Sequence, residues 1–183
     1  MKTALLVIDI QNDYFPGGRM PLENMEAAAT NCQALLTTCR ARQVPTFLVQ
    51  HLFPAPDAPF FAPASKGAEL HPSVAPTARD KVIVKQRINC FLGTGLLEEL
   101  RQLGAGELVI CGAMSHMCVD AAVRAAADLG FRCTVAHDAC ATRALAFNGV
   151  AIPAGAVHGA YMAALGAAYA RVMATAEIVS SLE

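Results

Sequence analysis

Three side chains that together suit hydrolytic chemistry follow separate apolar runs of the chain. Asp9 follows residues 5–8 (LLVI), Lys85 follows residues 82–84 (VIV), and Cys118 comes shortly after residues 107–112 (ELVICG). A thiol can attack a carbonyl carbon, a carboxylate can take and return the proton, and an ammonium can stabilise negative charge on both. This combination predicts an acyl-transfer site.

The positions of Asp9 and Lys85 each favour a role in the site. A carboxylate at the end of a buried strand must be paired or have a raised pKa, and either condition suits a general base. A lysine after three β-branched residues has a buried stem, so its ammonium needs an anion such as Asp9 or a Cys118 thiolate. The alternatives are a loop-anchoring Asp9 and a surface Lys85. Asp13 is interpreted as a structural turn residue.

Cys118 lies at a predicted turn from strand to helix, with Ser115 as the expected N-cap. The positive end of a helix favours thiolate over thiol, and its free N–H groups can receive the oxygen of a tetrahedral intermediate. The alternative is an inert buried thiol, which is the interpretation for the other six cysteines. His116 is two residues from Cys118, so it faces another direction and is not expected to act as its base.

Alternating apolar runs and helix-period segments predict an α/β fold with a parallel sheet. The expected strands, the first five apolar on both faces, are residues 3–10, 45–50, 81–85, 107–112, 132–137 and 171–175. The expected helices are residues 25–42, 96–103, 116–129, a short one after Thr142, and 156–170. Ligands bind beyond the carboxyl ends of such strands, where Asp9, Lys85 and Cys118 should meet. Residues 51–80, rich in proline, are expected to form a lid or binding loop.

Composition restricts the class of protein. The 183 residues are 55% hydrophobic, which predicts a single domain over residues 1–183. Fifteen acidic and 14 basic residues, without a basic run, argue against a nucleic-acid or charged-membrane partner. The seven cysteines form no CxxC pair and no secretory signal is visible, so we expect a cytoplasmic protein.

Residues 144–170 contain no Asp, Glu, Lys or Arg, and we interpret them as buried helix rather than a membrane span because they contain Asn148, Pro153, His158 and several glycines. A charged fraction of 16% and a mean hydropathy of +0.40 predict a homo-oligomer, a dimer or a tetramer. Nucleotide fingerprints of the GxGxxG and GxxxxGK[ST] types are absent, as is the GxSxG motif of serine hydrolases.

Several motifs carry a family resemblance that covers nearly the whole chain. They are residues 6–18 (LVIDIQNDYFPGG), 84–85 (VK), 112–120 (GAMSHMCVD), 124–126 (RAA) and 137–142 (HDACAT). With these motifs in this order, the chain resembles the isochorismatase-like cysteine hydrolases, a superfamily that includes nicotinamidases and N-carbamoylsarcosine amidohydrolases. It is most similar to small members with Gln-His after the second strand and a Phe-Phe loop, among them streptothricin-hydrolase-like proteins.

The resemblance implies a three-layer α/β/α, Rossmann-like fold with a six-stranded parallel sheet. It implies that Asp9, Lys85 and Cys118 form the catalytic trio, with Cys118 forming a thioester acyl-enzyme. It also implies a cis peptide between Ala113 and Met114, and an oxyanion hole made by the N–H groups of Met114 and Cys118.

Two departures from the family pattern matter. Nicotinamidases hold a metal with an Asp-x-His pair after the second strand, whereas this chain reads Val49-Gln50-His51, so we expect no metal and no other cofactor. Whether His51, Asp57 and His71 collect a metal is left open. True isochorismatases resemble this chain in fold but cleave a vinyl ether without a cysteine nucleophile, so Cys118 favours a C–N bond.

The sequence thus predicts a cysteine-dependent hydrolase of a small amide. Two alternatives are an isochorismatase-type vinyl ether hydrolase and a non-catalytic oligomeric scaffold or redox sensor. The residues expected to contact the substrate are Phe15, His51, Phe60, Phe61, Asn89, Phe91 and Met117.

Overall fold

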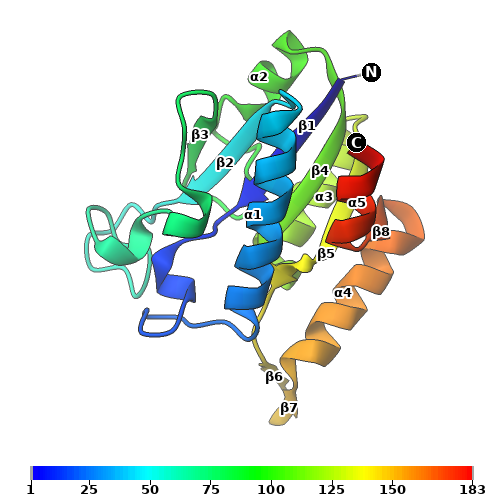
Figure 1. Cartoon of the computed structure of the whole chain (residues 1–183). Helices are drawn as coiled ribbons and strands as arrows, with labels where there is room; N and C mark the ends of the chain where they lie inside the picture. Colours follow the sequence, from blue (N-terminus) through cyan, green and yellow to red (C-terminus); the bar gives the residue numbers. More distant parts are fainter. Residues whose placement is uncertain (1, 183) are drawn as a thin grey trace.

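The computed structural model describes residues 2–182, which fold into a three-layer α/β/α arrangement (Figure 1). The strands are β1 (Lys2–Ile8), β2 (Thr46–His51), β3 (Lys81–Lys85), β4 (Ala105–Ala113), β5 (Arg132–Ala141), β6 (Leu145–Phe147), β7 (Val150–Ile152) and β8 (Ala170–Met173). The α-helices are α1 (Met25–Ala41), α2 (Leu96–Gln102), α3 (Asp120–Asp128), α4 (Ala154–Ala168) and α5 (Thr175–Leu182). Short turns η1 (Asn12–Tyr14), η2 (Lys66–Ala68) and η3 (Pro72–Val74) lie in the loops, and η4 (Ser115–Val119) leads into α3.

Six parallel strands form the main sheet in the order β3-β2-β1-β4-β5-β8. Strand order reverses beside β1, so a crevice is expected between the carboxyl ends of β1 and β4. β1 is buried on both faces: Leu5 and Val7 pack with α1 and α5, whereas Leu6 and Ile8 pack with α2, α3 and α4. The predicted fold class is confirmed.

Gly112 allows the ends of β1 and β4 to approach closely. It pairs with Ile8 and has φ of 124°, and a Cβ atom built on it would lie 2.0 Å from the Ile8 carbonyl oxygen. Only glycine fits such an approach. The turn that carries Cys118 therefore begins directly beside the residue that follows β1.

One predicted element was wrong. The short helix expected after Thr142 is the β6–β7 hairpin, whose turn residues Asn148 and Gly149 both have positive φ (50° and 77°). An Asn-Gly pair is typical of a type I′ hairpin turn, so the sequence did contain this signal. The strand predicted at residues 171–175 is β8 (Ala170–Met173), and residues 175–182 form α5, a helix that the sequence did not predict.

Two expectations about burial were also wrong. β3 is an edge strand, and Val82 and Val84 are 42% and 48% exposed, so it is not covered on both faces. α4 is not a buried helix, because its small residues, such as Gly159, are largely exposed and only one stripe, including Met162, packs inward. Within residues 2–182, no helix has the length and apolar character needed to cross a membrane.

Candidate active site

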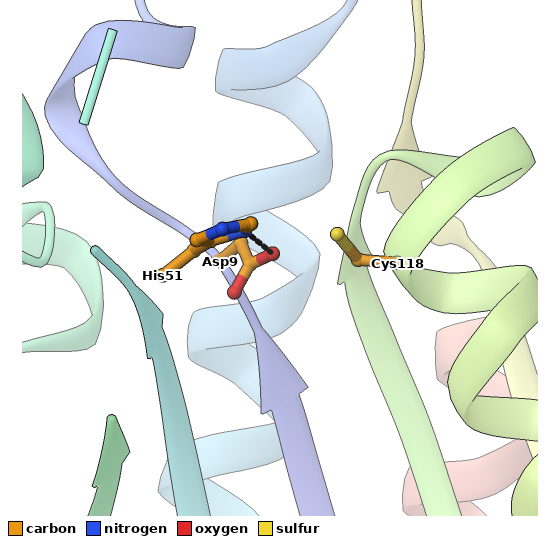
Figure 2. Close-up of side chains that lie close together, drawn as sticks. All are labelled: Asp9, His51 and Cys118. Atoms are coloured by element: carbon orange, nitrogen blue, oxygen red, sulfur yellow. Dashed lines mark ion pairs between the residues drawn. The ribbon is translucent and has the colours of Figure 1, made fainter. Parts of the chain in front are cut away.

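Asp9 is the first residue after β1 and is fully buried. Its φ of 52° is unusual for a residue other than glycine, and its backbone is fixed by hydrogen bonds from its N–H to Val49 O and from Gln11 N–H to its own carbonyl. The strained backbone directs the carboxylate toward the end of β2 and the turn after β4 (Figure 2). Asp9 is thus held rigidly at the reversal of strand order.

Lys85, the last residue of β3, connects the separate parts of the site. Its Nζ lies 2.8 Å from Asp9 Oδ2, 3.1 Å from Cys118 Sγ and 3.1 Å from His51 Nδ1, and its side chain is buried. The carbonyls of Arg87 and Ile88 lie 3.2 and 3.4 Å from the same nitrogen. The structure therefore brings Asp9, Cys118 and His51 within hydrogen-bonding distance of the Lys85 ammonium.

Cys118 lies in η4, a single turn of π-helix between β4 and α3. Its sulfur faces Asp9 and His51 across the gap between the strand ends (Figure 2). The peptide bond between Ala113 and Met114, just before this turn, is cis. Ser115 is not the N-cap, because the cap residue is Met114 and the Ser115 hydroxyl has other partners.

The electrostatics of the site differ from what the helix terminus alone predicts. Burial raises the pKa of the Cys118 thiol, the charge of Asp9 raises it further, and Lys85 offsets only part of the rise. Burial by itself would lower the pKa of Lys85, but the charges of Asp9 and Cys118 outweigh it and the pKa is raised. Burial and the charge of Asp9 therefore favour the protonated thiol, against the thiolate that the helix terminus is expected to favour.

The three side chains of the site are buried: Asp9, Lys85 and Cys118 are 0%, 1% and 2% exposed. Residues 52–80 contribute Phe53 and Phe61, whose rings pack near the His51 ring at centroid distances of 4.5 and 6.1 Å.

His51 is the one residue in the predicted set of substrate contacts for which the structure describes a contact with the trio. It pairs with Lys85 in the β2–β3 register, which places the two side chains together. Gln11 fixes its backbone: His51 N–H donates to Gln11 Oε1 at 2.7 Å, and Gln11 Nε2 donates to His51 O at 2.9 Å. Burial and nearby Lys85 lower the pKa of His51 to about 4, so the ring is neutral near pH 7.

The other predicted contacts lie farther out, and their role stays a prediction. Phe61 is fully buried and packs on Tyr14 and Phe60, and Phe15 stacks on His71 at 3.6 Å. Asn89 Oδ1 accepts the Phe91 N–H, and Phe91 packs toward Phe131. Met117 is 36% exposed on the same turn as Cys118.

A metal ion does not fit the one cluster of potential ligands found among residues 2–182. Asp9, His51 and Cys118 each provide one potential ligand atom, and these three atoms lie within 4.8 Å of one another. However, the Lys85 ammonium lies within about 3 Å of all three groups and supplies the positive charge that a cation would bring. His51, Asp57 and His71 do not form a ligand cluster, because Asp57 is exposed and His71 stacks on Phe15 and bonds to Ser73.

The opposite side of the Cys118 turn is held by neutral hydrogen bonds. Ser115 Oγ lies 3.3 Å from Ala141 O and 2.9 Å from His158 Nδ1 on α4. His116 Nδ1 lies 2.6 Å from Thr142 Oγ1, so His116 bonds to Thr142 rather than to the trio, as its spacing from Cys118 predicted. These contacts fix the turn to β5 and α4.

Two buried residues near the site were not assigned roles from sequence. Gln11 also donates to Ala68 O at 2.8 Å, so it ties the end of β2 to the loop over the site. Burial raises the pKa of the Tyr14 phenol, and the charges of Asp9 and Cys118 raise it further, which places Tyr14 in the electrostatic surroundings of the trio. The signal available was their position: both follow Asp9 within a polar stretch after an apolar strand.

Asp13 has the structural role predicted for it. Its buried carboxylate accepts the N–H of Phe61 at 2.6 Å and of Arg19 at 3.1 Å, so it ties η1 to the loop at residues 52–80. A Cβ on Gly67 would collide with this carboxylate, at 2.1 Å from Oδ1. Asp9 and Asp13, four residues apart, therefore have different functions.

The sheet order and the buried Cys, Asp and Lys define a Rossmann-like α/β protein with a polar centre where strand order reverses. Residues 3–177 match the family model described as the isochorismatase domain, and the chain belongs to the isochorismatase family. It is an isochorismatase-family hydrolase.

Relatives and solved structures agree with this assignment. The isochorismatase family protein YddQ of Bacillus subtilis is 50% identical over 96% of this chain and 97% of its own length. A streptothricin hydrolase of Streptomyces noursei is 36% identical over 76% of this chain, which corresponds to 49% of that protein. The crystal structure of an isochorismatase-type hydrolase from Oleispira antarctica has a TM-score of 0.95 and 49% identity, and covers 98% of this chain and 96% of that one.

Proposed function

We propose that the protein hydrolyses the C–N bond of a small amide. Cys118 is the nucleophile, Asp9 is the general base and acid, and the Lys85 ammonium positions the Asp9 carboxylate and the Cys118 sulfur. The observation that carries this proposal is the position of the Lys85 Nζ, 2.8 Å from Asp9 Oδ2 and 3.1 Å from Cys118 Sγ. One relative of this chain is named a streptothricin hydrolase, and a hydrolytic activity agrees with this proposal.

The first half of the reaction follows from the resting protonation. Because the raised pKa keeps Cys118 as a thiol, Asp9 takes the thiol proton as Sγ attacks the carbonyl carbon. The carbonyl oxygen becomes an oxyanion, which the N–H groups of Met114 and Cys118 stabilise. The C–N bond then breaks, Asp9 returns the proton to the leaving nitrogen, and a thioester remains on Cys118.

Water completes the cycle. Asp9, again a carboxylate, takes a proton from a water molecule that attacks the thioester carbonyl. The C–S bond breaks, the proton passes to the sulfur, and the acid leaves. Lys85 stays charged throughout because the negative charges of Asp9 and Cys118 favour its protonated form.

Burial argues against the redox-sensor alternative. Sensor cysteines are accessible thiolates, whereas Cys118 is 2% exposed and its pKa is raised. We therefore expect slow alkylation of Cys118 near neutral pH that speeds up as pH rises. Hydrolysis of a vinyl ether needs no sulfur nucleophile. Removing the Cys118 thiol should therefore abolish amide hydrolysis but leave vinyl ether hydrolysis intact, which distinguishes the two alternatives.

The test is a panel of small primary amides, assayed for released ammonia with wild type, Cys118→Ala and the matched control Cys133→Ala, which removes a buried thiol on β5. We expect Cys118→Ala to lose at least about 10³-fold in kcat/KM and Cys133→Ala to stay within about threefold. Mass spectrometry of quenched wild type should find an acyl group on Cys118. Full turnover of any substrate, isochorismate included, by Cys118→Ala would reject the thioester mechanism.

A further inference from the structure

Unpaired polar atoms are concentrated on two residues of the site. Among the buried side-chain nitrogen and oxygen atoms of residues 2–182, those without a hydrogen-bond partner are both carboxylate oxygens of Asp9, one of which forms the ion pair with Lys85, and Nε2 of His51. Buried polar groups in native proteins are nearly always paired, so each exception needs an explanation. The base role of Asp9 explains its oxygens, but nothing in the proposed mechanism uses His51 Nε2.

The hydrogen atom on the His51 ring can be placed from its contacts. The Lys85 ammonium is a donor only, and it lies 3.1 Å from His51 Nδ1. A hydrogen on Nδ1 would point at this cation, so the contact favours Nδ1 as an acceptor that carries no hydrogen. Since a neutral imidazole has one N–H and the ring is neutral near pH 7, the hydrogen is on Nε2.

Nε2–H is thus a buried donor without an acceptor. His51 is 2% exposed, so bulk water does not accept a hydrogen bond from its Nε2–H group. The neighbouring rings of Phe53 and Phe61 are inclined to it by 33° and 43° rather than edge-to-face, so neither offers its π face squarely to the N–H. An unpaired buried donor is unfavourable, and its cost is recovered when a ligand brings an acceptor.

We infer that His51, held in the Nε2-protonated form by Lys85, donates a hydrogen bond to the substrate, and that the preferred amides carry an acceptor atom within a few bonds of the carbonyl that Cys118 attacks. The inference rests on the proposed function and deepens it. The geometry limits the reach: one His51 ring nitrogen lies within 4.8 Å of Cys118 Sγ, the atom that bonds to the carbonyl carbon. Nε2 belongs to the same five-membered ring, so it lies at most one ring width farther from the sulfur.

Gln11 makes this donor rigid. Its two hydrogen bonds to the His51 backbone fix the residue from both sides, and the Lys85 contact fixes the ring from within. A donor whose position is set before binding discriminates well, because a substrate without an acceptor leaves it unpaired. The site therefore selects substrates by an acceptor that does not take part in the reaction.

The substrate test uses two pairs of amides that differ by one acceptor atom: methoxyacetamide against butyramide, and picolinamide against benzamide. We expect wild type to prefer the acceptor-bearing member of at least one pair by roughly tenfold in kcat/KM. His51→Gln, which keeps an N–H near the ε position, should retain the preference. His51→Asn, which keeps an acceptor for Lys85 but lacks the distal N–H, should lose it. Both variants disturb Lys85, so the ratio between paired substrates is the readout, because a merely structural role would lower both rates equally.

The second measurement needs neither turnover nor a variant enzyme that folds. Nitrogen-15 NMR of uniformly labelled wild type reports which nitrogen of each imidazole is protonated, and the His51 ring is assigned by through-bond correlation. We expect Nε2–H, unchanged between pH 5.5 and 8. A His51 ring protonated on Nδ1, or charged in that range, overturns the inference, as does equal turnover of both members of both pairs by wild type.

The two proposals fail differently. If no amide is hydrolysed and Cys118→Ala changes nothing, the proposed function is wrong, and so is the inferred substrate preference. The NMR result still decides which nitrogen of the His51 ring is protonated. If amides are hydrolysed through Cys118 without regard to the added acceptor, the proposed function stands and the inference is wrong.

Discussion

The two sides of the Cys118 turn are held in opposite ways. On the front side, Cys118 faces Asp9, Lys85 and His51, with an ion pair in the protein interior and buried atoms left without partners. On the rear side, Ser115 and His116 are joined by neutral hydrogen bonds to Ala141, Thr142 and His158. The rear side is ordinary stabilising structure, whereas the front side retains unpaired polarity that costs stability and is available for a ligand.

Breaking the front ion pair should have the largest effect on stability. Lys85→Met leaves the Asp9 carboxylate buried without its cation, and we expect the free energy of unfolding to fall by about 3–5 kcal/mol. Adding Asp9→Asn removes the stranded charge and should recover most of that loss, while hydrolysis stays abolished in both variants. Urea denaturation and the amide assay measure the two effects.

A matched surface pair provides the control for this prediction. Arg124 and Asp120 form an exposed ion pair on α3 at 2.8 Å, and Arg124→Met should cost less than about 1 kcal/mol. If Lys85→Met lowers the free energy of unfolding no more than Arg124→Met does, the buried ion pair between Asp9 and Lys85 does not contribute more to stability than an exposed pair.

The pH dependence of stability should come largely from the front side. His51 has a pKa lowered from 6.5 to about 4, so between these values the unfolded chain binds a proton that the folded protein does not. Stability is therefore complete above about pH 6.5 and falls as pH decreases toward 4, by up to about 3 kcal/mol from this residue. Denaturation curves at pH 7.5, 6 and 5 should show a smaller decrease for His51→Gln than for wild type.

Other histidines act in the same direction. Burial lowers the pKa of His71, His116 and His158, so part of the pH dependence persists in His51→Gln. Identical pH dependence of the two proteins would show that His51 is already protonated at pH 5 or solvated in the folded state.

The smallest effect is expected on the rear side. Ser115→Ala removes the hydroxyl shared by Ala141 and His158, and we expect a loss of about 1–2 kcal/mol in unfolding free energy with kcat/KM within threefold of wild type. Ser181→Ala on α5, whose hydroxyl bonds only within its own helix, should change stability by less than about 0.5 kcal/mol. A tenfold loss of turnover in Ser115→Ala without a loss of stability would place the rear side in the chemistry.

Sequence reasoning located elements best where the local pattern was strong. β3 was placed at its observed residues, α1 and α2 within one residue, and β1 within two at its C-terminal end. It failed where tertiary contacts decide: β5 extends four residues beyond the predicted end because the register shifts beside Gly112 and adds pairs with Cys140 and Ala141. The α4 error arose because an alanine-rich, uncharged segment was interpreted as buried, although only one stripe of it packs inward.

The sequence by itself determined which groups lie at the carboxyl ends of the strands, because continuous apolar runs set the strands and parallel order puts their ends at one edge. Asp9, Lys85 and Cys118 follow from that rule. The tertiary structure alone decided their protonation and partners. A pKa depends on burial and on charges brought from distant parts of the chain, and the contacts between Lys85 and the sulfur of Cys118 or the ring of His51 exist only once three strand ends are assembled.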